Sequence, residues 1–147
     1  MSLREFLEHP RAGAPDGGPR PRIAAWRTAV STLVARFRSI LGKFQQLRLI
    51  DWSVLRNYAG IRYNAEALTI ALDENAITLE PTTIDPEPGV LGRVSVNCGV
   101  REVHLDCSLD GKLWRYHWVI PRDGASEELT DEAIENVVEE LFRSTTP

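Results

Sequence analysis

Alternating apolar and polar residues on both sides of Asp110-Gly111 predict a β-hairpin over residues 100–121. Asp-Gly is a strong hairpin signal, because both central residues of a type I′ turn need positive φ. A two-residue turn at this dipeptide would pair Cys107 with Trp114, and every residue further out with its counterpart on the other strand. One face of the hairpin would then be apolar and aromatic, and the other would carry polar side chains.

Apolar residues recur at alternating steps of four and three over residues 23–47, which predicts a long amphipathic helix. Val34 and Leu41 widen the apolar stripe, and a wide stripe favours a helix lying on a sheet over the narrow seam of a coiled coil. A dimer formed through this helix is the rival interpretation. The candidate interface positions on the stripe are Trp26, Leu33, Phe37, Ile40 and Phe44.

The region between the long helix and the hairpin predicts one short helix and three strands. Asp51 is a good N-cap for a short helix that ends at Gly60. Pro81 is expected to end the second strand, and the Pro- and Gly-rich run 82–92 is expected to form an irregular loop. The predicted strands cover residues 67–72, 76–80 and 93–97.

A final helix is predicted after residue 130. Thr130 is a good N-cap, and Asp131 and Glu132 would lie where the helix dipole favours anions. Together these elements predict an α+β fold of two layers. It would hold a mostly antiparallel sheet of about five strands, a long N-terminal amphipathic helix and a C-terminal helix.

The length of 147 residues fits a single domain, which we place at residues 23–147. Residues 1–22 are expected to form an arm or linker, since residues 9–22 hold four Pro and three Gly and show no hydrophobic period. No uncharged stretch approaches the ~20 residues of a membrane helix, and two cysteines do not make a disulfide scaffold. We therefore expect a cytoplasmic protein with no membrane span.

Positive charge is concentrated at the start of the chain. Residues 1–50 hold nine Lys and Arg against three Asp and Glu, whereas residues 51–147 hold eight against eighteen. The two parts should attract each other, so we expect the basic helix to lie near the acidic remainder of the fold. The alternative is contact with an anion or a nucleic acid, although no recognised nucleic-acid motif is present. The candidate contacts are Arg20, Arg22, Arg27, Arg36, Arg38 and Lys43.

The predicted hairpin register places two histidines face to face. His104 would lie opposite His117, and Asp106 opposite Arg115 on the same face. Two imidazoles and a carboxylate can hold a metal ion, but Arg115 would oppose a bound cation. We favour a polar surface with a cross-strand ion pair, and keep a metal site at His104 and His117 as the alternative.

Neither cysteine is expected to be catalytic. Cys107 would face Trp114 in the core, and Cys98 would lie at an exposed turn with no base beside it. The sequence contains none of the common phosphate-binding, dinucleotide-binding or metalloprotease motifs. We therefore expect no catalytic residue and no cofactor.

A tyrosine, an alternating hairpin that ends in Leu-x-Pro and a later Gly-Arg-Val follow one another between residues 62 and 94. The residues are Tyr63, Leu68, Ile70, Ile77, Leu79, Pro81, Gly92, Arg93 and Val94. With the C-terminal helix up to Phe142, this pattern resembles a small β-rich module of uncharacterised bacterial proteins, some of them associated with conflict or phage-defence genes. The resemblance implies an accessory subunit, and it transfers no catalytic residue.

These inferences predict a non-enzymatic protein-binding or regulatory accessory subunit, which the resemblance links to bacterial antiviral defence. It would act through helix-mediated association with a protein partner or with further copies of itself. Two alternatives stay open. One is a metal-dependent enzyme at the face of His104 and His117, and the other is a nucleic-acid accessory protein that uses the basic arm and helix.

Overall fold

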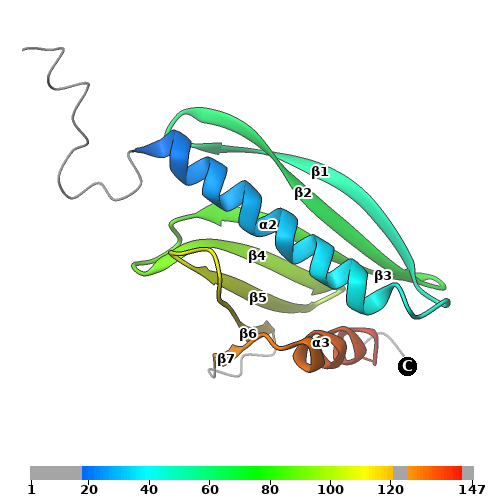
Figure 1. Ribbon diagram of the computed structural model, residues 1–147. Coiled ribbons are helices and arrows are strands. Elements are labelled where there is room, and N and C mark those ends of the chain that lie inside the picture. The colour runs from blue at the N-terminus through cyan, green and yellow to red at the C-terminus, as the bar shows by residue number, and fades with distance from the viewer. Residues whose placement is uncertain (1–17, 121–125, 144–147) are drawn as a thin grey trace, which may run out of the picture.

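An antiparallel sheet, with each strand paired to its neighbour along the chain, forms one layer of the fold (Figure 1). The computed structural model describes residues 18–120 and 126–143. Within them the sheet has seven strands, in place of the five predicted. The strands are β1 (Arg48–Tyr58), β2 (Ile61–Leu72), β3 (Asn75–Ile84), β4 (Val90–Cys98), β5 (Arg101–Ser108), β6 (Trp114–Ile120) and β7 (Glu127–Glu128).

Two helices form the second layer. Helix α2 (Pro19–Leu41) crosses β1 to β4, and α3 (Asp131–Arg143) packs on β3 to β5 and touches α2 (Figure 1). The predicted α+β class and antiparallel sheet are therefore confirmed. Neither helix of the described chain is long and apolar enough to cross a membrane.

Helix α2 begins and ends earlier than its apolar stripe predicted. It starts at Pro19, inside the predicted arm, because the fixed φ of proline suits the first helical turn and its missing N–H is not needed there. It ends at Leu41, where Gly42 caps it and donates its N–H to the Arg38 carbonyl at 2.8 Å. The predicted end at residue 47 is wrong, because the chain turns at residues 42–46 to enter β1.

The apolar stripe of α2 is used by the protein's own core. Trp26, Leu33 and Phe37 are buried against the sheet, so the prediction that they form an interface is wrong. Ile40 is partly buried, and Phe44 lies beyond the end of the helix with 36% of its surface exposed. The physical reason is that the sheet is larger than predicted, and the stripe that α2 packs on it is buried from Ile23 to Leu41.

The short helix predicted after Asp51 is instead strand β1. It pairs with β2 along its full length, from Arg48 opposite Ala71 to Tyr58 opposite Ile61. Ala59 and Gly60 join the two strands in a two-residue turn, with φ of 52° and 81°. The spacing of Trp52, Leu55 and Tyr58 suits one helical face locally, but the pairing with β2 decides the structure.

Strands β3 and β4 are longer than predicted. Pro81 does not end β3, because the register shifts between Pro81 and Thr83 and this irregularity accommodates the missing N–H of proline. The loop predicted over residues 82–92 shrinks to residues 85–89, where Asp85 and Gly89 have positive φ.

The predicted register of the β5–β6 hairpin is confirmed from Cys107 opposite Trp114 to Val103 opposite Trp118. The predicted turn type is wrong. Asp110 is not at positive φ, and the Ser108 N–H donates to the Leu113 carbonyl at 2.8 Å around a four-residue loop. A four-residue loop centred on the Asp110–Gly111 peptide bond pairs the same residues as a two-residue turn at that dipeptide. The predicted register is therefore correct although the predicted turn type is not.

Helix α3 starts as predicted. The Thr130 hydroxyl accepts the Ala133 N–H at 3.0 Å, which is the side-chain contact of an N-cap. Strand β7, which precedes it, is only two residues long and was not predicted.

Candidate functional sites

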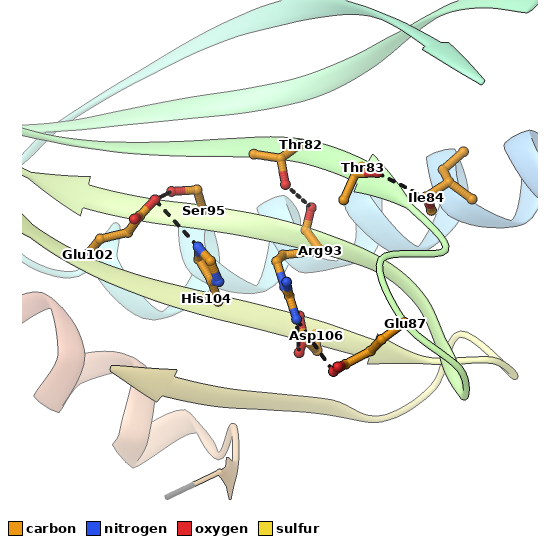
Figure 2. A network of polar contacts seen from close by, with 9 residues as sticks. All are labelled: Thr82, Thr83, Ile84, Glu87, Arg93, Ser95, Glu102, His104 and Asp106. Carbon is orange, nitrogen blue, oxygen red and sulfur yellow. Dashed lines mark hydrogen bonds and ion pairs between the residues drawn. The ribbon is translucent and has the colours of Figure 1, made fainter. Parts of the chain in front are cut away.

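A polar network lies on the face of β4 and β5 that is turned away from the core (Figure 2). Ser95 donates its hydroxyl to the Glu102 carboxylate at 2.5 Å, and the same oxygen lies 3.5 Å from Nε2 of His104. Arg93 binds Asp106 through two contacts, Nε to Oδ1 at 2.7 Å and Nη2 to Oδ2 at 3.0 Å. Side chains of the two antiparallel strands β4 and β5 are thus tied together by charge-assisted hydrogen bonds.

This network differs from the predicted one in its ion pair. Asp106 is neutralised by Arg93 of β4, whereas Arg115 donates to the hydroxyl and carbonyl of Ser126. The predicted pair between Asp106 and Arg115 is therefore wrong, although the two residues do lie opposite each other. The strand predicted over residues 93–97 is part of β4 and lies beside β5, and its Arg93 supplies the closer guanidinium.

The two histidines meet as predicted, but the residues around them do not suit a cation. The His104 and His117 rings lie edge to face with centroids 5.4 Å apart. Both oxygens of Asp106 accept from Arg93, and across residues 18–120 and 126–143 no three His, Cys, Asp or Glu side chains come together as metal ligands. Burial, and then the charge of Arg93, lower the pKa of His104, so the imidazole is held neutral.

The network is also not arranged for nucleophilic catalysis. The Ser95 hydroxyl donates its hydrogen bond to the Glu102 carboxylate, whereas a serine nucleophile needs a base such as histidine beside its hydroxyl. Both cysteines are buried, which confirms the prediction for Cys107 and corrects the exposed turn predicted for Cys98. Burial raises the pKa of Cys98, and it raises that of Cys107 to about 12, so neither thiol is activated.

Most of the basic side chains of α2 pair with the acidic remainder of the fold, as the charge distribution predicted. Arg22 contacts Asp85 at 2.6 Å, Arg36 contacts Asp131 at 2.9 Å, and Arg38 pairs with Asp51, so three pairs join α2 to other parts of the chain. Lys43, in the turn that follows α2, contacts Glu135 at 3.2 Å. Four of the six predicted anion contacts are thus neutralised within the protein.

The other two predicted contacts, Arg20 and Arg27, line a groove between α2 and β2. Arg62 of β2 joins them there. Sequence reasoning missed Arg62, because it lies in a strand far along the chain and only the packing of α2 on β2 brings it close.

The outer edge of β1 is a second surface that sequence reasoning missed. No strand of the described chain pairs with this edge, which is eleven residues long. Ile50, Trp52 and Leu55 are 47%, 36% and 56% exposed. The indole N–H of Trp52 donates to the Thr69 hydroxyl at 3.1 Å, which holds the ring over β2. The β-forming composition of residues 48–58 is a signal for this strand, but Trp52, Leu55 and Tyr58 also have a helical spacing.

In comparisons with family models, with curated proteins and with solved structures, nothing matches this chain. The resemblance to a defence-associated module stays a prediction.

Proposed function

We propose that this protein is a self-associating accessory subunit, and that two copies join by antiparallel pairing of their β1 edges. The long exposed edge of β1 supports this proposal. A free strand edge presents unpaired backbone N–H and C=O groups, and a long apolar one is a site of association. The proposal keeps the protein-binding role predicted from the sequence and transfers it from the helix to the sheet.

The hydrogen-bonding groups of the edge follow from the turn that ends β1. Tyr58 and Ile61 flank a two-residue turn, so they are expected to exchange both backbone hydrogen bonds. Every second residue back along β1 then bonds to β2 in the same way. The residues between them point their N–H and C=O groups away from the sheet. These residues are Leu49, Asp51, Ser53, Leu55 and Asn57.

The single observation that carries the proposal is the symmetry of β1 about Trp52. Residues 49–55 read Leu-Ile-Asp-Trp-Ser-Val-Leu, so matching side chains stand at equal distances on either side of the tryptophan. A two-fold axis through Trp52, perpendicular to the sheet, would pair leucine with leucine, Ile50 with Val54, and Asp51 with Ser53. A two-fold interface must be self-complementary in this way, which is why a second copy is the occupant that the edge fits.

The same register favours the central pair. Because Trp52 bonds inward to β2, the two tryptophans would form a non-hydrogen-bonded pair, in which side chains of opposite strands lie closest. The pairing would end beyond residues 49 and 55, because Arg48 would then face Arg56 of the other copy.

Sedimentation velocity from about 1 μM to about 1 mM tests the proposal. We expect a concentration-dependent dimer for the unaltered chain. Trp52→Lys and Trp52→Glu should each be monomeric, because each places two like charges opposite each other on the axis. A one-to-one mixture of these two variants should dimerise again, because opposite charges then meet.

Leu109→Lys is the matched control for a third variant, Leu55→Lys. Both leucines are similarly exposed, at 53% and 56%, and both substitutions add the same charge, but Leu109 lies in the β5–β6 loop. Only Leu55→Lys should weaken the dimer. A chain that stays monomeric at the highest concentration, or a Trp52→Lys variant that dimerises as well as the unaltered chain, would overturn the proposal.

A further inference from the structure

Three cations that form no ion pair within residues 18–120 and 126–143 gather in one groove. The described residues include fourteen Lys and Arg side chains, and eight of these form ion pairs with Asp or Glu. The remaining six are Arg20, Arg27, Arg48, Arg62, Lys112 and Arg115. Arg20, Arg27 and Arg62 line the same groove between α2 and β2. In a chain with a net charge of −4, this clustering is not an effect of general basicity.

The groove consists of two adjoining hollows of about 520 and 370 Å³, which share Ala24, Arg27 and Asn64. Arg27 donates from Nε to the Asn64 carbonyl at 2.8 Å, so its guanidinium is held against β2. Its two terminal nitrogens make no hydrogen bond to the described chain. Arg20 precedes Arg27 by two helical turns and therefore projects from the same side of α2.

The remaining lining leaves room for a ligand and offers further donors. Ala24 and Thr28 are small side chains of α2 beside Arg27, and Ser31 and Ser53 add hydroxyl groups. Ile23 and Tyr63 form an apolar wall at the end that holds Arg20 and Arg62. One carboxylate, Glu66, lines the other hollow, so the groove is cationic at one end only.

We infer that the Arg20 end of this groove binds a small phosphorylated ligand. The planar guanidinium fork matches pairs of phosphate oxygens, and all three cations are arginines. Three like charges in one groove repel one another, and a multiply charged anion removes that repulsion. The two hollows fall in the size range of small-molecule sites. The inference is independent of the proposed dimer, since it rests on the α2–β2 groove.

Isothermal titration calorimetry of the full chain at low salt tests this inference, with pyrophosphate and ADP as probes. We expect saturable binding of both. Arg62→Ala should weaken it about tenfold, the size of effect expected when one hydrogen-bonded charge is removed. Arg27→Lys should also weaken it, because lysine keeps the charge and loses the fork.

Tighter binding of ADP than of pyrophosphate would identify a nucleotide as the source of the phosphate, and equal binding would identify the phosphate groups alone. Either result supports the inference.

Arg48→Ala and Lys112→Ala are the matched controls, because both remove an exposed cation that has no carboxylate partner and lies outside the groove. They should leave the affinity within about twofold of the unaltered chain, which is the scale of a long-range charge effect. An equal loss in these controls would overturn the inference, and so would the absence of binding to both probes. Binding of single-stranded nucleic acid without binding of pyrophosphate or ADP would overturn it in favour of a nucleic-acid surface.

Discussion

Gly92 of β4 lies directly beneath the indole ring of Trp26, and replacing it with alanine tests the packing of α2 on the sheet. A Cβ atom at residue 92 would lie 2.5, 2.6 and 2.7 Å from three ring carbons of Trp26, namely Cε3, Cζ3 and Cδ2. Trp26 is fully buried, and its ring centroid is 5.8 Å from that of Trp114. Gly92 is not at positive φ, so space alone decides the outcome.

The cost follows from the distance that the ring would have to move. Carbon atoms in contact sit about 3.5–4.0 Å apart, so Trp26 would have to retreat by about 1 Å. The interior is close-packed and the ring is rigid, which leaves Trp114 and the helix to absorb this movement. Overpacking of this kind costs about 1–3 kcal/mol, and we expect Gly92→Ala to fall near 3 kcal/mol because one methyl group meets three ring atoms.

Urea unfolding followed by tryptophan fluorescence and by circular dichroism measures this cost. We expect a lower midpoint with an unchanged slope, since the surface exposed on unfolding is nearly the same. A domain stability of about 5–15 kcal/mol leaves the variant folded. The same substitution in a Trp26→Leu background supplies the control, because the clash is then removed.

The penalty for Gly92→Ala should fall to less than about half in the Trp26→Leu background, as expected for residues in direct contact. A penalty below about 0.5 kcal/mol in the unaltered background would refute the reasoning. An equal penalty in both backgrounds would also refute it, because the cost would then come from the strand and not from the ring.

Two further predictions concern the cap of α3 and the polar network. Thr130→Ala should lower stability by about 1 kcal/mol in the same urea assay, because the Ala133 N–H loses its acceptor, whereas Thr130→Ser should cost less than half as much. Burial and Arg93 lower the pKa of His104 from its ordinary value of 6.5, so the unfolded chain binds the proton more readily than the folded one. The stability that His104 contributes is complete above about pH 6.5 and is lost as the pH falls through the lowered pKa. The charged and titratable groups around it are Arg93, Glu102, His117 and Asp106. His104→Gln should therefore reduce the loss of stability between pH 7 and pH 5, and parallel pH profiles for the two proteins would contradict this.

The elements predicted correctly are those whose signal lies in a short stretch of chain. The pairing of Cys107 with Trp114 follows from alternation about one turn, and the start of α3 follows from Thr130 and the apolar period after it. In both cases the residues that decide the structure are near neighbours, so no knowledge of the rest of the fold is needed.

Strand β1 shows where such reasoning fails. Asp51 and Gly60 are good helix caps, and the apolar residues between them have a helical spacing, yet the segment pairs along its full length with β2. The backbone hydrogen bonds of a strand come from another segment, so the local pattern does not contain them. The same error hid the exposed edge about Trp52, which is the surface that the proposed dimer uses.

The sequence by itself determined the α+β class, the presence of a long helix with a wide apolar stripe, the register of the β5–β6 hairpin and the attraction between a basic start and an acidic remainder. Only the tertiary structure decided which cations are neutralised. Arg36 meets Asp131 from 95 residues away, while Arg62 pairs with no carboxylate of the described chain and joins Arg20 and Arg27 in a groove. Periodicity reports which side of an element is buried, but the partners of a charge depend on long-range packing, and both proposed binding surfaces depend on that packing.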